Sequence, residues 1–293
     1  FGDGASAGAY VGYINYAHDS NSMQFSAGGS ERLRIDGATG KVSIRIASGD
    51  GTLHVHTASA GTVAASAQAD DLVIENSTEG GMTIITPDDQ SARIRFTSPS
   101  TNNDVGGATI FYRQNINKML VGTAVAGGVL SLASGAGVEA MHISADGEVT
   151  KPLQPAFSAT VNAAQNNIAT DTDVVVVWGA ETFDVGANFS ASEFTAPVTG
   201  KYQLNLLLRL NNIDTACNYY IISFFSSNNN YRFIYDPGGF SGDLSYWATS
   251  LSVLADMDAN DTVYITINQA GGTAQTDVDP GNTYSRFSGY LVA

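Results

Sequence analysis

The feature that most limits the fold of this chain is a strand-like stretch that is apolar on both of its faces. In residues 218–225, NYYIISFF, one parity carries Tyr220, Ile222 and Phe224, and the other parity is apolar as well. Side chains of an extended strand point alternately to opposite faces. A two-layer sandwich covers only one face of each sheet. We therefore expect a neighbouring copy of the chain to cover Tyr220, Ile222 and Phe224.

A longer strand-like stretch, residues 200–210, has one apolar face and one mixed face. Its apolar parity consists of Tyr202, Leu204, Leu206, Leu208 and Leu210. The opposite parity is polar apart from Leu207. We expect the leucine face in the core and Leu207 at the same interface between copies.

The composition favours an all-β protein. Hydrophobic residues make up 43% of the 293 residues and charged residues only 14%. Segments rich in Val, Ile, Thr and aromatic residues are short, and no amphipathic run is long enough to predict a substantial helix. Cys217 is the only cysteine, so stability has to come from burial or assembly rather than from an intrachain disulfide.

Charge and hydropathy narrow the range of partners. The net charge of −15 is spread over both halves without a basic patch, so we expect no nucleic-acid partner. No apolar stretch has transmembrane length and no signal peptide is visible, so we expect no membrane insertion. Because the chain starts at Phe1 without a methionine, we expect it to be a piece of a longer protein.

Two prolines, Pro152 and Pro155, indicate a linker at residues 151–155. The preceding part, residues 1–150, consists of very short strand-like pieces and predicts a β-rich shaft of stacked strands and hairpins. The following part, residues 156–293, has longer strands and predicts an antiparallel jelly-roll sandwich.

The shaft contains a weak internal repeat, residues 8–44 and 107–151. In both copies a Tyr-containing strand leads through an Asn-rich turn to a Met, and a Glu-led alternating strand follows. Such small units need neighbours to bury their apolar faces, so we expect them to stack along an axis.

The second part resembles the jelly-roll head of the complement and tumour-necrosis-factor superfamily. The resemblance lies in PAFSA (155–159), in ETFDVGANFSASEFTAPVTGKYQL (181–204) and in FSGYLVA (287–293). Members of that superfamily are trimers, so the resemblance implies a homotrimer here.

The first part is similar to repeats of bacteriophage tail fibres and related virion appendages. The similar residues are INYAHDSNSMQFSAGGSERLRIDGATGKV (14–42) and GTLHVHTASAG (51–61). Fibre shafts of this type are trimers, and the resemblance implies a virion protein that acts outside the cell.

His54 and His56 lie on the same face of a predicted strand. In a monomer such a pair is an ordinary surface or packing feature. In a parallel trimer the two residues would form two rings of three imidazoles on the axis, which suits a six-coordinate transition metal. We expect no other cofactor to be required.

Aromatic and amide side chains gather in residues 228–247. Rings stack on sugar faces and amides bind hydroxyl groups, although the alternation of Tyr231, Phe233 and Tyr235 is equally typical of a core strand. The following loop is the better candidate for receptor binding, because function concentrates on loops held by a rigid scaffold. The predicted receptor-binding residues are Asp236, Phe240, Asp243, Tyr246 and Trp247.

These patterns predict a structural and adhesive protein rather than an enzyme, since no nucleophile elbow, phosphate-binding loop or zinc spacing is present. We expect the distal part of a trimeric phage tail fibre or spike, bound to other virion proteins through residues that precede Phe1. Its ligand would be a glycan or protein of the host surface. Two alternatives remain: a tailspike enzyme that degrades polysaccharide, and a purely structural head or neck fibre or bacterial surface filament.

Overall fold

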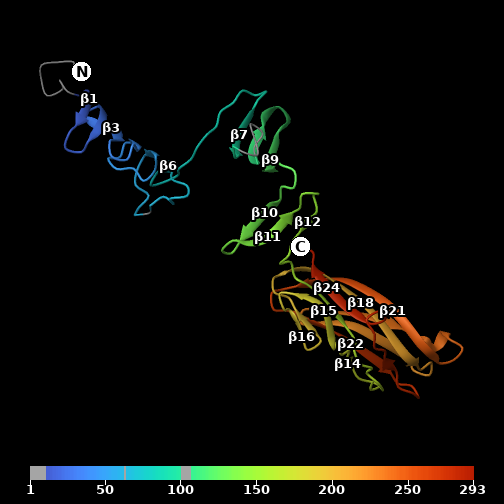
Figure 1. Ribbon diagram of the computed structural model, residues 1–293. Helices are drawn as coiled ribbons and strands as arrows, with labels where there is room; N and C mark the ends of the chain where they lie inside the picture. Colours follow the sequence, from blue (N-terminus) through green and yellow to red (C-terminus); the bar gives the residue numbers. More distant parts are fainter. Residues whose placement is uncertain (1–10, 63, 100–106) are drawn as a thin grey trace. The chain divides into compact units, whose positions relative to one another are not determined.

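The computed structural model describes residues 11–62, 64–99 and 107–293. Apart from two 3₁₀ turns, Gln114–Ile116 and Pro237–Gly239, all regular structure in this part is β-strand, which confirms the all-β class (Figure 1). One compact unit holds β1 to β6 and a second holds β10 to β24. No helix in the described ranges could cross a membrane. Residues 8–10 of the first predicted repeat lie outside the described residues.

The N-terminal sheet has six strands in the order of the sequence. They are β1 (Gly12–Ala17), β2 (Ser22–Ala27), β3 (Ser30–Asp36), β4 (Val42–Ile44), β5 (Leu53–His56) and β6 (Leu72–Glu75). Strands β1 to β4 form an antiparallel meander, whereas β4, β5 and β6 run parallel.

The register places two complete rows of apolar side chains on one face of this sheet. The first row is Tyr16, Met23, Ile35, Val42, Leu53 and Leu72, and the second is Ile14, Phe25, Leu33, Ile44, Val55 and Ile74. We call this the apolar face of the β1–β6 sheet. No side chain of this face is buried within the chain: six of the twelve are exposed, Ile14 and Leu72 by 60% and 50%, and the six others are half-buried.

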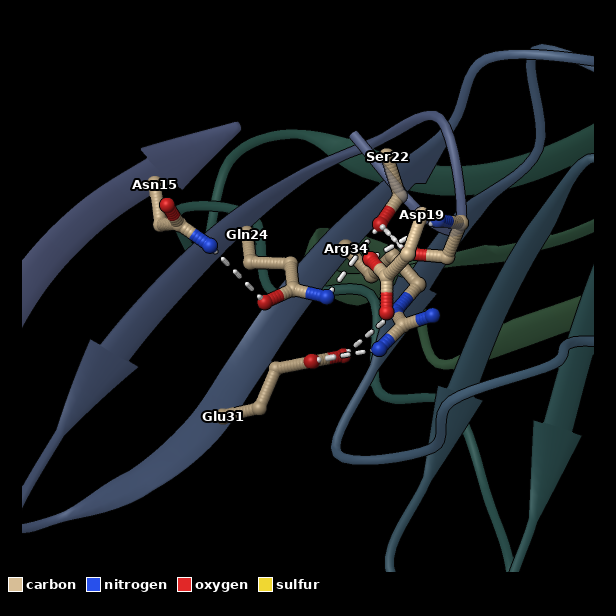
Figure 2. Close-up of polar contacts among 7 residues, drawn as sticks. Asn15, Asp19, Ser22, Gln24, Glu31 and Arg34 are labelled. Carbon is tan, nitrogen blue, oxygen red and sulfur yellow. Dashed lines mark hydrogen bonds and ion pairs between the residues drawn. The ribbon is translucent and has the colours of Figure 1, made fainter. Parts of the chain in front are cut away.

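The opposite face of the same sheet is polar. One of its rows contains Asn15, Gln24, Arg34, Ser43 and His54, and ends with Val73. Figure 2 shows part of this face, where Asn15 donates to Gln24, Gln24 donates to Ser22, and Arg34 donates two hydrogen bonds to Glu31. This sheet is therefore amphipathic, with a polar face on which many side chains bind one another and an apolar face that nothing described in the chain covers.

The two predicted repeats share a hairpin that the structure makes explicit. In the β1–β2 hairpin the hydroxyl of Tyr16 donates to Asn21, which has a left-handed backbone with φ 47°. In the second copy the hydroxyl of Tyr112 donates to Asn117, five residues later again, at φ 50°. Asparagine tolerates this conformation better than most residues, so the same Tyr–Asn pair closes both turns.

The second repeat is divided between two three-stranded sheets. One contains β7 (Ser91–Phe96), β8 (Ala108–Arg113) and β9 (Lys118–Thr123); the other contains β10 (Leu130–Ser134), β11 (Val138–Ile143) and β12 (Val149–Thr150). In the first repeat the Glu-led strand β3 pairs with the hairpin strand β2. In the second repeat the corresponding strand β11 pairs instead with β10, which is an additional strand.

The C-terminal part is a sandwich of two sheets, here called the head. The first head sheet has the order β15 (Ala180–Val185), β13 (Ala156–Thr160), β24 (Arg286–Leu291), β18 (Gly200–Ile213), β21 (Leu244–Met257), and β23 (Asp277–Val278) also pairs with β18. The second head sheet has the order β16 (Phe189–Ser190), β17 (Glu193–Thr195), β22 (Thr262–Ala270), β19 (Tyr219–Ser226), β20 (Asn230–Tyr235), and β14 (Val174–Val175) also pairs with β22. The chain crosses repeatedly between the sheets, and the pairs in these orders are antiparallel, which defines the jelly roll. The domain boundary at 151–155 itself stays a prediction.

The core of the head lies between its two sheets. Strand β18 contributes Tyr202 and the four leucines of its parity, each at most 1% exposed, as the alternation predicts. At one end of the core Phe157 stacks on Phe189 and Phe194, with ring centroids 4.9 and 4.6 Å apart, and meets Phe287 edge-on. All buried apolar side chains of the described residues lie at Phe157 or later in the chain.

The interface predicted for β19 is wrong in its choice of face. Tyr220, Ile222 and Phe224 are at most 1% exposed and lie in the core of their own chain, opposite buried residues of β22. The other parity is the outer one, where Tyr219 is 41% exposed. Both parities are apolar, so alternation alone could not distinguish the inner face; the pairing with β22 decides it.

One buried carboxylate joins two loops of the head. Asp214 is 1% exposed and accepts backbone N–H groups from Ala216, Thr273 and Ala274, the first and last at 2.8 and 2.7 Å. Burial alone would raise the pKa of Asp214, but the amide donors outweigh it and hold the pKa below its ordinary value.

We expect Asp214→Ala to lower the free energy of unfolding by about 2–4 kcal/mol, because three amide groups lose their acceptor. Because the pKa is lowered in the folded state, this contribution is complete above the unfolded pKa of about 3.9 and is lost as the pH falls through the folded value. Denaturant unfolding of the full chain at one concentration, between pH 7 and pH 2, measures both effects. The exposed Asp258→Ala is the control and should change stability by less than about 0.5 kcal/mol; an equal loss in both variants contradicts this role of Asp214.

Candidate functional site

The outer face of the first head sheet is an exposed surface with few charges. Its register aligns Leu254, Gln203 and Tyr290 in one row and Ser252, Asn205 and Ser288 in the next. Leu254 and Tyr290 are 55% and 49% exposed. Large exposed apolar groups among small residues give a flat surface of the kind that meets another protein.

The polar groups at the centre of this face bind one another. Gln203 Nε2 donates to Ser252 Oγ at 2.7 Å, and Ser252 Oγ donates to Asn205 Oδ1 at 3.2 Å. Leu207 follows on the same face, opposite Ser250, and is half-buried, so its predicted place at an interface remains open to a second copy. Neutral groups that are already satisfied cost less to bury than charged ones.

Three residues that the sequence analysis did not connect form a cluster further along this face. The guanidinium of Arg209 lies 5.0 Å from the ring centroid of Tyr246 and 4.7 Å from that of Tyr284. Arg209 Nε is 3.1 Å from Asp279 Oδ2, and Asn211 donates to the same carboxylate at 2.9 Å. The tyrosines are 67% and 50% exposed. Two accessible rings on a fixed cation can stack against a sugar ring or a partner side chain.

A slot opens between the edge strands β20 and β21. It has a volume of about 370 Å³, and its lining is mostly apolar and aromatic, with Arg232 and Thr249 as the polar members beside Phe233, Tyr235 and Trp247. Tyr235 stacks on Trp247 with ring centroids 4.2 Å apart and on Tyr220 at 5.1 Å. The buried hydroxyl of Tyr235 has no hydrogen-bond partner among the described residues, and burial strongly raises its pKa. The slot therefore suits an apolar side chain with one polar group.

The predicted receptor-binding residues fall into three groups. The carboxylates are exposed but organise loops: Asp236 accepts from the amide of Gly238, and Asp243 accepts from the amide and hydroxyl of Thr215. Trp247 is part of the ring stack at the slot. Phe240 and Tyr246 remain as accessible rings, at 45% and 67% exposed.

His54 and His56 lie on one face of β5, as predicted, but the side chain of His54 is buried and contacts groups of its own chain. It is 1% exposed, its Nδ1 accepts the amide of Asp50 at 3.1 Å, and its Nε2 lies 3.1 Å from Glu75 Oε2. Gly49 packs directly above it, where a Cβ would lie 2.8 Å from the Cβ of His54. Across the described ranges no group of three metal-ligating side chains is assembled within the chain. The transition-metal site stays a prediction that this arrangement of His54 does not support.

Several solved structures are similar to the C-terminal half of the chain. The globular domain of zebrafish complement 1qA protein is 17% identical, with 48% of this chain and 98% of that chain covered and a TM-score of 0.36. A crystal structure of murine APRIL at pH 8.0 is 12% identical, with 47% and 99% covered and a TM-score of 0.35. No family model and no curated protein matches the chain. The order of strands in the two head sheets, rather than these scores, defines the head as a jelly roll.

The structure assigns different roles to the adjacent residues Tyr246 and Trp247. We expect Trp247→Ala to lower the free energy of unfolding by about 2–3 kcal/mol, because it removes a half-buried ring from the stack with Tyr235. We expect Tyr246→Ala to change stability by less than about 1 kcal/mol, because that ring is mostly in water. Thermal and denaturant unfolding of the full chain compare the two variants, and equal effects would refute the division.

Proposed function

We propose that this chain is the distal part of a homotrimeric bacteriophage attachment fibre. The strands that precede the linker form its shaft, and the jelly-roll head contacts the host surface. Other virion proteins are the partners of this fibre within the particle. The protein acts outside the cell as part of the virion and performs no catalysis itself.

One observation supports assembly above all others. Among the described residues before Phe157, no apolar side chain is buried, and 22 large hydrophobic residues there are at least 39% exposed. A single-layer sheet with a bare apolar face is not stable alone in water, because burial has to offset the conformational entropy that ordering costs. Further copies of the chain supply that burial.

The head supports assembly through two surfaces. The outer face of the first head sheet presents Leu207, Leu254 and Tyr290 with neutral polar neighbours, and the slot between β20 and β21 exposes apolar lining. If the outer face of one head contacts the slot of the next, the interface is heterologous, because it joins two different surfaces. Such an interface closes into a cyclic trimer when successive copies are related by a rotation of one third of a turn.

Attachment follows from the accessible rings at the head surface. Phe240, Tyr246 and Tyr284 are exposed rings, and Arg209 with Asn211 and Asp279 lies beside the two tyrosines. Rings next to polar side chains recognise sugars through stacking and hydrogen bonds. Three heads on each fibre, and several fibres on each virion, convert weak single contacts into strong avidity.

The assembly is tested by light scattering of the purified full chain at micromolar concentration. We expect a mass three times the 30.6 kDa of one chain. A stable monomer refutes the fibre, because the bare faces would then be tolerated in water; a dimer would refute the trimer alone.

The attachment role is tested by blocking phage adsorption to host cells with the purified trimer. We expect Phe240→Ala/Tyr246→Ala to reduce blocking at least about tenfold, since ring stacking is worth about 1–2 kcal/mol per contact. Tyr219→Ala, an exposed ring of the second head sheet, is the matched control. Trimer mass is measured for each variant. Intact trimers that never block adsorption favour a purely structural fibre, and new reducing ends released from host polysaccharide favour the tailspike enzyme.

A further inference from the structure

We infer that the apolar face of the β1–β6 sheet is closed by the same face of two other copies of this chain, which together enclose a dry core along the shaft. This inference rests on the proposed homotrimer and assigns the surface by which its N-terminal part assembles.

The apolar face is continuous over the whole sheet. Both rows contain one apolar residue from every strand, from Ile14 and Tyr16 on β1 to Leu72 and Ile74 on β6, with no polar or charged residue between them. At roughly 60–80 Å² each, the twelve side chains offer roughly 700–1,000 Å² of apolar area, which matches the share of about 800 Å² that one partner contributes to a stable interface. The surface is therefore large enough to hold subunits together.

The distribution of charge favours a second copy as the occupant. Each chain carries a net charge of −15, so copies repel one another wherever their charged surfaces meet. The two rows contain no charged residue, so the same face of two copies can meet without electrostatic repulsion. A charged partner protein would find no ion pair to make on this surface.

The opposite face of the sheet is built to remain in water. Its polar side chains already bind one another, as in the pair Arg34–Glu31 and in the chain from Asn15 through Gln24 to Ser22 (Figure 2). The loop at Gly49 covers Ser43 and His54 on this side and leaves the apolar side free. The apolar face of the sheet is therefore the one turned to the other copies, and the polar face is the one turned to water.

The sheet needs its cover whenever it is folded, and this requirement also favours identical copies. A partner that binds only part of the time would leave this single-layer sheet unstable, because an uncovered apolar face contributes too little free energy to keep the strands ordered. Copies of the same chain are present in fixed proportion at synthesis, and each brings an identical face in need of cover.

The test compares two adjacent exposed residues of β1 in the full chain. Ile14→Lys places a charge on the apolar face, and Asn15→Lys places the same charge on the polar face. Ile14 is 60% exposed in the single chain, so a lysine there removes no packing contact within the chain and acts through the cover that the face receives. Hydrogen exchange of the β1–β6 amides, read separately from that of the head, is the measurement, with trimer mass taken from light scattering.

We expect Ile14→Lys to speed exchange of the β1–β6 amides at least about tenfold while the head amides remain protected, and Asn15→Lys to leave both unchanged. A trimer in which both variants exchange like the wild type overturns this inference and leaves the proposed function standing. Equal loss of protection in both variants overturns it too, because the effect would not depend on the face. A monomeric wild-type chain overturns the inference and the proposed function together.

Discussion

The alternation of side chains along β-strands is the constraint on which the rest of this structure depends. When the side chains of one parity are buried on one face of the sheet, those of the other parity lie on the opposite face. A sheet is stable only if its apolar face is covered. The head satisfies this condition internally, since its two sheets cover each other and enclose the leucine face of β18. The β1–β6 sheet has the same amphipathic pattern with no second layer in the described chain. The head thus meets this requirement within one chain, whereas for the β1–β6 sheet we propose that further copies of the chain meet it.

The difference between the two parts follows from strand length and connection. Strands β18 and β21 have 14 residues each and lie within one sheet of a closed sandwich, whereas β4 has three and β5 and β6 have four. The described connections between the parallel strands β4, β5 and β6 contain no helix or strand that could form a second layer over the sheet. The head therefore encloses its own core, with Asp214 joining two of its loops, whereas the β1–β6 sheet has an apolar face without cover in the described chain.

The sequence predicted the buried face of a strand correctly where only one parity is apolar, and wrongly where both parities are apolar. The inner face of β18 was predictable because only one parity is uniformly apolar. For β19 both parities are apolar, so the inner face was assigned wrongly and only the pairing with β22 resolves it. The Arg209 cluster and the apolar rows of the shaft depend on which residues lie opposite one another across strands. Register is a property of the whole sheet, and neither spacing nor composition within one strand contains it.

The Tyr–Asn hairpin has a consequence for how such a fibre can change its length. Its turn is fixed by two of its own residues, so the hairpin keeps its geometry whether the next strand joins it, as β3 does, or joins β10 elsewhere, as β11 does. A hairpin whose turn is fixed by its own residues behaves as an independent structural module. Such a segment can be duplicated, inserted or deleted between other strands without disturbing its internal alignment, and in the fibre that we propose this would change the length in whole steps.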